Sequence, residues 1–266
     1  MYPEQGVSMT DSPDRRLVLQ LLSSAALISL VACEEEPAIS TDSDVSIVGD
    51  VDETAWASGG TAAITGSYPD PFTTAATTCA LVATTTEGPC TTTSSQTRQD
   101  VSEGWEGLPV RLMLKIVDSS CNALSGVTVR VWHTNFEGSY SGQTPNNNMC
   151  LTEQDYSSQD FFRGSQTTDS DGVVTFDTCF PGWYASRAVH IHLQVEGTAI
   201  TQVFFPETIT AGVFANHPDY EGYGQPDTTF ANDNILANVS DVQRHVLEVS
   251  QASDGVMLAS KVVTVS

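Results

Sequence analysis

PGWYASRAVHIHLQV, residues 181–195, combines a strand pattern with a pair of histidines. From Val189 onward apolar and polar residues alternate, which predicts a β-strand whose side chains point alternately to its two faces. His190 and His192 therefore leave the same face, about 7 Å apart along the backbone. The chain has only five histidines, and this spacing is typical of a metal chelate. Strand histidines two apart also occur as polar groups on a solvated face, so the pair alone leaves both interpretations open.

Further strand signals lie on both sides of this stretch. They are rich in β-branched and aromatic residues and are separated by Asp, Asn, Ser and Gly turns. No segment of comparable length has a helical apolar stripe with caps. The sequence therefore predicts an all-β fold, an antiparallel β-sandwich with long active-site loops. The predicted strands cover residues 110–118, 127–135, 173–180, 188–197, 200–205, 245–250 and 257–266.

One loop is long for a β connection. It runs from Gly138 to Asp169, and long loops in compact domains tend to carry function.

Composition limits the size and the partners of the protein. The 266 residues, of which 40% are hydrophobic, suffice for one main core. Ten Lys and Arg face 33 Asp and Glu, a formal net charge of −23. Such a surface repels nucleic acid and anionic membranes at long range, so neither is an expected partner.

The N-terminus has the pattern of an export signal. Residues 1–32 contain Arg15 and Arg16 followed by an apolar run that ends in small residues. LVAC at 30–33 resembles a bacterial lipobox, which implies cleavage before Cys33 and lipid on its sulfur. A plain secretory signal is the alternative, and Sec and twin-arginine export both remain open. We expect a lipid-anchored protein of the bacterial cell envelope that meets the membrane only through this anchor.

The remaining chain divides into a tether and a domain. Residues 33–76 have little periodicity and are interpreted as a flexible linker, and residues 77–266 as the domain. Five further cysteines suggest disulfides in an oxidising compartment. Cys79 and Cys90 close a short loop and are the first choice of pair, whereas two of Cys121, Cys150 and Cys179 could pair and leave one free.

A tyrosine lies close to the histidine pair. Tyr184 precedes His190 by six residues, after a Pro-Gly turn that leads into the same strand. A phenolate is a hard anionic oxygen ligand, and a set of phenolates and imidazoles favours ferric iron over softer or less charged ions.

Three stretches carry a resemblance to a known family. VTVRVWHTNFEGSYSG at 127–142, FFRGSQTTDSDGVVTFDTCFPGWYASRAVHIHLQV at 161–195 and ITQVFF at 200–205 resemble the intradiol ring-cleavage dioxygenases, the family of protocatechuate and catechol dioxygenases. The similarity is greatest to their exported single-chain members. It extends from TTTEGPC at 84–90 to the C-terminus, and several motifs in matching order are more specific than any one of them.

The resemblance implies a set of site residues. The ligands of a non-haem ferric ion, Fe(III), would be Tyr140, Tyr184, His190 and His192. Tyr184 would also take a proton from the substrate.

Three more residues acquire roles through the same resemblance. Arg187 would stabilise negative charge that develops on the substrate, Gln202 would lie beside the site, and Trp132 would be an aromatic of the substrate pocket. Without the resemblance they read as a surface arginine, a strand ladder residue and a core residue.

The implied reaction cleaves the aromatic ring of a catechol or hydroxyquinol between its two hydroxylated carbons. The partners would be a small aromatic diol and O2, and the product a muconate-type diacid. One alternative is a non-catalytic β-sandwich lipoprotein that binds iron or catecholate compounds. A zinc hydrolase is a further alternative, but HxH lacks a third strong ligand at sensible spacing.

Two departures from the family pattern concern the pocket. Residues 134–137 read TNFE, where exported relatives usually have a cysteine, an acid and small residues, and Cys90 stands where an aromatic is common. The missing cysteine would leave Cys121 to pair with Cys150 or Cys179. Because both departures border the expected pocket, the substrate is left open. The oligomeric state is also open.

Overall fold

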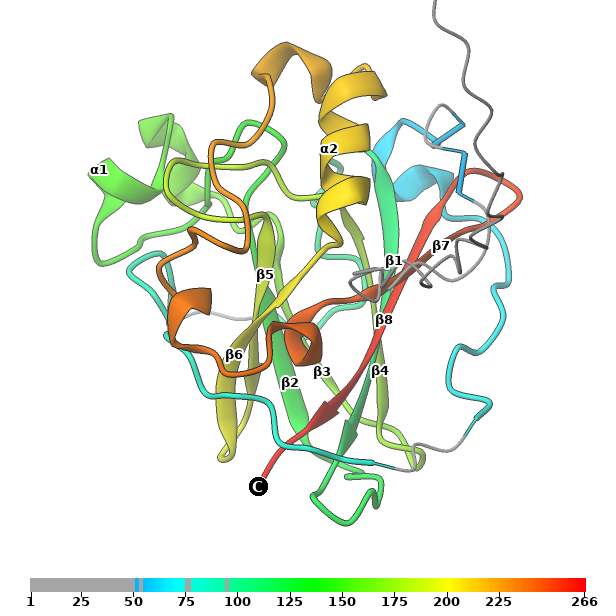
Figure 1. The fold of residues 1–266 in the computed structure, drawn as a ribbon. Helices are drawn as coiled ribbons and strands as arrows, with labels where there is room; N and C mark the ends of the chain where they lie inside the picture. Colours follow the sequence, from blue (N-terminus) through cyan, green and yellow to red (C-terminus); the bar gives the residue numbers. More distant parts are fainter. Residues whose placement is uncertain (1–50, 53–54, 75–77, 94–95) are drawn as a thin grey trace, which may run out of the picture. The chain divides into compact units, whose positions relative to one another are not determined.

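Two four-stranded β-sheets enclose the core of the protein (Figure 1). The structure is a computed structural model that describes residues 51–52, 55–74, 78–93 and 96–266. The first sheet has the order β4-β1-β8-β7 and the second β3-β2-β5-β6. The first contains β1 (Pro109–Val117), β4 (Val173–Cys179), β7 (Glu248–Gln251) and β8 (Met257–Thr264). The second contains β2 (Thr128–Trp132), β3 (Arg163–Thr167), β5 (His190–Val195) and β6 (Ala199–Phe204).

The predicted all-β sandwich is confirmed, with one parallel pair within it. Every predicted strand segment overlaps an observed strand. Neighbouring strands run antiparallel except β1 and β8, which pair in parallel from Val110 and Met257 onward. A parallel pair cannot be joined by a tight turn and needs a long crossover connection, which the chain between β1 and β8 provides.

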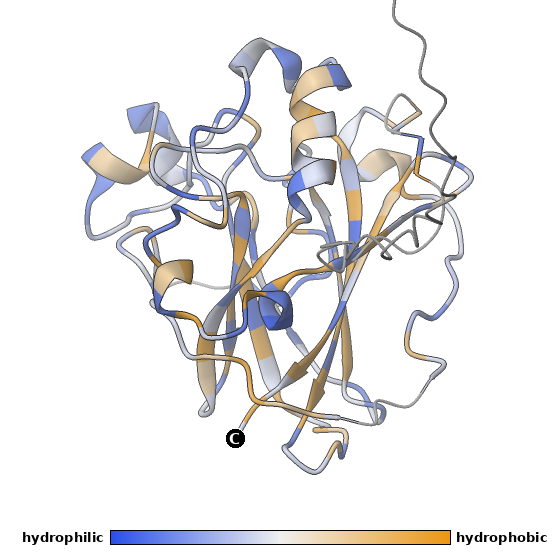
Figure 2. Cartoon of the chain, viewed as in Figure 1, coloured by the Kyte–Doolittle hydropathy of each residue, from blue (hydrophilic) through white to orange (hydrophobic). Residues whose placement is uncertain are grey.

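Side chains alternate along β5, so this strand contributes apolar residues to the core from one face and the two histidines from the other. Ile191, Leu193 and Val195 point into the core between the sheets. His190 and His192 point to the opposite face, yet they are only 3% and 2% exposed. The outer face of β5 is therefore covered by other parts of the chain. Figure 2 shows hydrophobic residues recurring along the strands.

The long loop and the segment after β6 contain structure that the sequence did not indicate. The 138–169 loop includes α1 (Asn147–Cys150), a 3-10 turn (Gln154–Ser158) and the polar edge strand β3. After β6 the chain forms α2 (Glu207–Asn216), which buries Ile209, Val213 and Phe214. The helix begins after Pro206 without a side-chain cap. Tertiary packing, rather than local propensity, stabilises such a helix.

The tether predicted for residues 33–76 does not extend over residues 55–74. Trp56 is 8% exposed and packs in the main core. The 3-10 turn Gly60–Ala63 is held by a hydrogen bond from the Gly60 N–H to the Gly107 carbonyl at 2.9 Å. The prediction failed because the segment is bound by a few long-range contacts that leave no periodic pattern.

The predicted signal peptide 1–32, Cys33 and the tether to residue 50 lie outside the described residues. Within the part of the chain that the structure does describe, no helix has the length and the apolar character needed to cross a bilayer.

The disulfides differ from the predicted pairing. Cys79 bonds to Cys121 and Cys90 to Cys150, so the expected Cys79–Cys90 pair is wrong, as is the pairing of Cys121 with Cys150 or Cys179. The Cys79–Cys90 pair was predicted because the two cysteines are close in sequence. The fold instead joins cysteines that are 42 and 60 residues apart. Among the described cysteines Cys179 is unpaired, and burial raises the pKa of its thiol to about 12.

Removal of the Cys90–Cys150 bridge is expected to destabilise the domain substantially. The bridge closes a loop with a sequence separation of 60, and chain entropy for such a loop corresponds to about 4 kcal/mol. Denaturant unfolding of the double Cys90→Ser, Cys150→Ser variant measures this loss. Cys179→Ala serves as the control because it removes a thiol without opening a loop, and a double variant as stable as this control contradicts the prediction.

Candidate metal centre and active site

Two neutral imidazoles form one half of the site. The Nε2 atoms of His190 and His192 lie 3.2 Å apart. The Nδ1–H of His190 donates to the Ala188 carbonyl at 2.6 Å, which leaves the Nε2 lone pair free to bind a metal. Burial lowers the pKa of His190 to about 3, and burial together with His190 holds that of His192 well below its usual value. Both rings are therefore in the neutral state that metal binding requires.

Two tyrosines from separate loops form the other half. Tyr140 and Tyr184 each follow a glycine by two residues, Gly138 and Gly182. The N–H groups of both glycines donate to the Asn135 carbonyl, at 3.0 Å and 2.9 Å. This shared acceptor joins the two loops through their backbones and places both phenols over the outer face of β5.

The close approach of the loops depends on the absence of a side chain at position 182. A Cβ atom on Gly182 would lie 2.4 Å from the Asn135 oxygen and 2.5 Å from the Gly138 nitrogen. We expect Gly182→Ala to separate the loops, to cost about 1–3 kcal/mol of stability and to weaken metal binding. Thermal unfolding and metal titration measure both effects.

Gly222→Ala is the matched control for this substitution. A Cβ atom there meets nothing within 4 Å, so the variant should behave like the parent. Equal metal affinity in the two variants would show that the contact at Gly182 does not position the tyrosines.

The four side chains converge on one point. The Tyr140 Oη atom lies 3.4 Å from the Tyr184 Oη and 3.2 Å from the His192 Nε2. The Tyr184 Oη lies 3.3 Å from the His190 Nε2. These separations exceed those of ordinary hydroxyl hydrogen bonds, about 2.5–3.0 Å. They are what neighbouring ligands show when each lies about 2 Å from a shared ion.

The chemistry of this donor set fits a hard, highly charged cation. Burial, and the neighbouring Tyr184, raise the pKa of Tyr140 well above its usual value, and burial also raises that of Tyr184. A phenolate here therefore needs a cation beside it. Among the described residues no group of three or more His, Cys, Asp or Glu could hold a metal, and the four donors described above combine two imidazoles with two phenol oxygens. Two phenolates and two imidazoles suit ferric iron.

Arg187 lies beside the four donors and is held from three directions. Its Nε donates to the carboxylate of Asp233 at 2.9 Å, one Nη to the Tyr184 Oη at 3.4 Å and the other to the Gln202 Oε1 at 2.5 Å. Gln202 faces His192 across the β5–β6 pair. The structure thus brings Arg187 and Gln202 next to the candidate site.

A cavity of about 320 Å³ opens beside the donors, and three of the four donor residues line it. Tyr140, Tyr184, Arg187 and His192 line it together with residues from three other segments. Its volume falls in the range of small-molecule sites, about 300–1,000 Å³. Four convergent donors at a cavity of this size constitute a site where a small molecule can meet a bound metal.

Comparison with known proteins agrees with this geometry. Residues 85–210 match the family model described as Dioxygenase. An intradiol ring-cleavage dioxygenase from Tetranychus urticae has a similar structure, with a TM-score of 0.62 and 25% identity over 71% of this chain and 95% of that chain. A second dioxygenase crystal structure gives a TM-score of 0.62 and 24% identity over the same shares, 71% and 95%.

The family match and the likeness to an intradiol ring-cleavage dioxygenase indicate that this chain is an enzyme. Among curated protein sequences, none matches it. The matched segment contains all four candidate ligands together with Arg187 and Gln202.

Trp132, predicted as an aromatic of the substrate pocket, packs against His192. It is fully buried and is not among the residues that line the cavity. Its ring stacks on the His192 ring, with centroids 4.7 Å apart and planes 10° apart, because the two residues face each other across the β2–β5 pair. The Nδ1 atom of His192 has no hydrogen-bond partner among the described residues. The His190 ring is oriented by a hydrogen bond. The His192 ring is instead oriented by stacking on Trp132.

Sequence reasoning did not identify Asp233 as part of the site. The Asp233 side chain is 0% exposed and also accepts the Ala188 N–H at 2.8 Å. It lies in HPDYEGYGQPDTTFANDNIL, residues 217–236, where no local signal separates it from other acidic loop residues.

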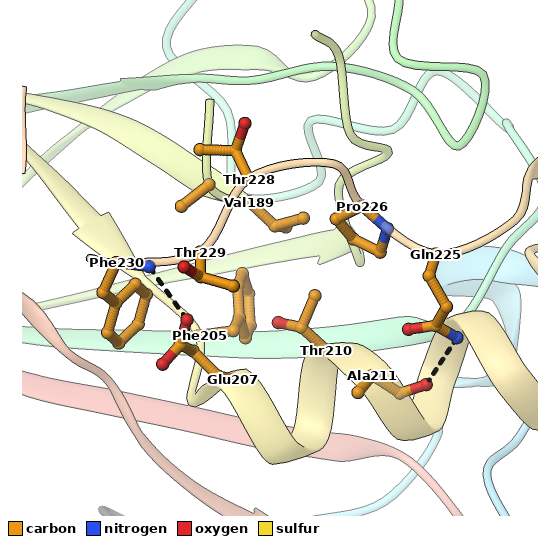
Figure 3. Close-up of a pocket in the computed structure, with 11 residues that line it drawn as sticks. Val189, Phe205, Glu207, Thr210, Ala211, Gln225, Pro226, Thr228, Thr229 and Phe230 are labelled. Carbon is orange, nitrogen blue, oxygen red and sulfur yellow. Dashed lines mark hydrogen bonds between the residues drawn. The ribbon is translucent and has the colours of Figure 1, made fainter. Parts of the chain in front are cut away.

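A second, smaller cavity of about 90 Å³ lies beside α2 (Figure 3). The Phe230 N–H donates to the Glu207 carboxylate at 2.8 Å and the Gln225 amide to the Ala211 carbonyl at 3.1 Å across it. None of the predicted site residues lines this cavity, so it is separate from the candidate metal centre.

Proposed function

We propose that this enzyme holds a non-haem ferric ion through Tyr140, Tyr184, His190 and His192 and cleaves a catechol or hydroxyquinol with O2. Cleavage between the two hydroxylated carbons would give a muconate-type diacid. The observation that carries the proposal is the convergence of four donor atoms, 3.2 to 3.4 Å from their neighbours, three of which belong to residues that line a cavity.

The metal and the protein would contribute differently. A bound ferric ion supplies Lewis acidity and draws electron density from the aromatic diolate. Tyr184 lines the cavity, so its phenol oxygen is placed to take a proton from a substrate hydroxyl. Arg187 would place its positive charge where negative charge develops on the ring. Gln202 and Asp233 orient Arg187, and the loops over β5 limit the access of water.

The decisive experiment combines spectroscopy with iron quantitation on the chain without residues 1–32. We expect a broad tyrosinate-to-iron absorption, about one iron per chain, a red shift when catechol is added without oxygen, and a ring-opened diacid once O2 is admitted. A colourless protein that takes up neither ferric nor ferrous iron would overturn the proposal. Iron and catechol binding without a ring-opened product would favour the non-catalytic binding protein.

We further propose that the enzyme is exported and lipid-anchored through Cys33. The two disulfides support export, because such bonds persist in oxidising compartments. The intact mass of the mature protein should show a lipid on Cys33, and Cys33→Ala should release the chain from the membrane fraction. A mature chain that begins elsewhere would contradict the anchor.

A further inference from the structure

We propose that the active-site cavity selects catechols with an uncharged, apolar substituent and discriminates against carboxylated catechols. The inference rests on the proposed ring-cleavage function and concerns the substrate class of the same site.

The cavity offers a carboxylate a single lining cation, and that cation is already paired. Among the described residues that line it, Arg187 is the only charged one. All three of its guanidinium nitrogens already have partners, namely Asp233, Tyr184 and Gln202. A substrate carboxylate would have to compete with the buried carboxylate of Asp233 for this one positive charge.

Acidic residues surround the cavity instead. Glu87 lies between the lining residues Thr86 and Gly88. Asp227 accepts the N–H of the lining residue Ser186 at 3.1 Å. Together with Asp233 they add negative charge around the cavity, in a chain whose net charge is −23, while the Arg163 guanidinium lies 5.7 Å from the centroid of the Tyr140 ring. An anionic substrate is therefore repelled on its approach to the protein.

The wall of the cavity is suited to apolar groups. Pro89, Met149 and Ile235 line it from three separate segments, next to the Cys90 side of the Cys90–Cys150 bridge. Met149 is 59% exposed, although large hydrophobic side chains are usually covered. A carboxylate placed against this wall would lose its hydration without gaining a partner, whereas an alkyl or ester group would bury apolar surface.

A matched pair of ligands tests the inference. Protocatechuate and its methyl ester have nearly the same shape and differ in charge. We measure dissociation constants by calorimetry without oxygen on the iron-loaded protein, because the ester also changes ring reactivity and would obscure a comparison of rates. The ester is expected to bind at least about 10-fold more tightly than the acid, and 4-tert-butylcatechol more tightly than catechol.

A charge-introducing variant extends the test. Met149→Lys adds a cation at the apolar wall and is expected to raise the affinity for protocatechuate relative to the methyl ester. Met149→Gln is the control, since it has similar length and polarity without charge and should leave the acid-to-ester ratio near that of the parent. Equal ratios in the Lys and Gln variants would contradict a charge-based selection at this wall.

Catechol itself separates the two possible failures. If the protein cleaves catechol but binds protocatechuate as tightly as the ester, the substrate inference is overturned and the proposed function stands. If it binds and cleaves no catechol at all, both are overturned.

Discussion

Tyr140→Phe is expected to remove most of the iron affinity and the ring-cleaving activity while leaving the fold intact. The side chain is 2% exposed, and the substitution keeps its ring and deletes only the oxygen that contacts the Tyr184 Oη and the His192 Nε2. Loss of an outer-shell partner of a metal site typically costs about 10–100-fold. Loss of an anionic ligand should exceed that range, in both metal affinity and kcat.

Three measurements and a control make this prediction specific. Iron content, the intensity of the tyrosinate absorption and kcat should fall together, while the thermal unfolding midpoint of the metal-free protein stays near that of the parent. Tyr156→Phe is the control, because that hydroxyl donates to Glu137 at 2.9 Å in the same loop region without touching the four donors. A Tyr140→Phe protein with one tightly bound iron and near-parental kcat would exclude Tyr140 as a ligand.

Arg187→Gln is expected to lower both stability and catalysis, for two separable reasons. Burial opposes ionisation of Asp233, yet the Ala188 N–H and the Arg187 guanidinium outweigh it and hold its pKa below the ordinary value. Removal of Arg187 leaves this carboxylate, 0% exposed, without its cation. Breaking a buried ion pair in this way typically costs about 3–5 kcal/mol.

The catalytic loss should be additional to the loss of stability. A positioned group that stabilises developing negative charge contributes about 10²–10³-fold to kcat. Asp233→Asn is the matched comparison, since it breaks the same ion pair but keeps the Arg187 cation beside the substrate. We expect both variants to be destabilised in denaturant unfolding, and Arg187→Gln to lose far more kcat among folded molecules. Equal losses of kcat would show that Arg187 acts only through the structure.

Local sequence patterns account for most of the framework. The alternation around Ile191 and Leu193 predicted β5 and placed His190 and His192 on one face, because side chains alternate along any strand. The same reasoning located the other predicted strands. The prediction that Tyr140, Tyr184, Arg187 and Gln202 lie together came from the resemblance of ordered motifs, and the geometry around the four donor atoms agrees with it.

The sequence by itself therefore determined the two-sheet class, the paired histidines and the candidate donor set. Tertiary structure alone decided the Cys90–Cys150 pairing, the helix α2, the position of Trp132 behind His192 and the burial of Asp233 against Arg187. A strand pattern is repeated every two residues and is visible locally. A disulfide partner, a stacked ring or a buried counter-ion is set by which distant segments the folded sheets and loops bring into contact, and no local pattern records that contact.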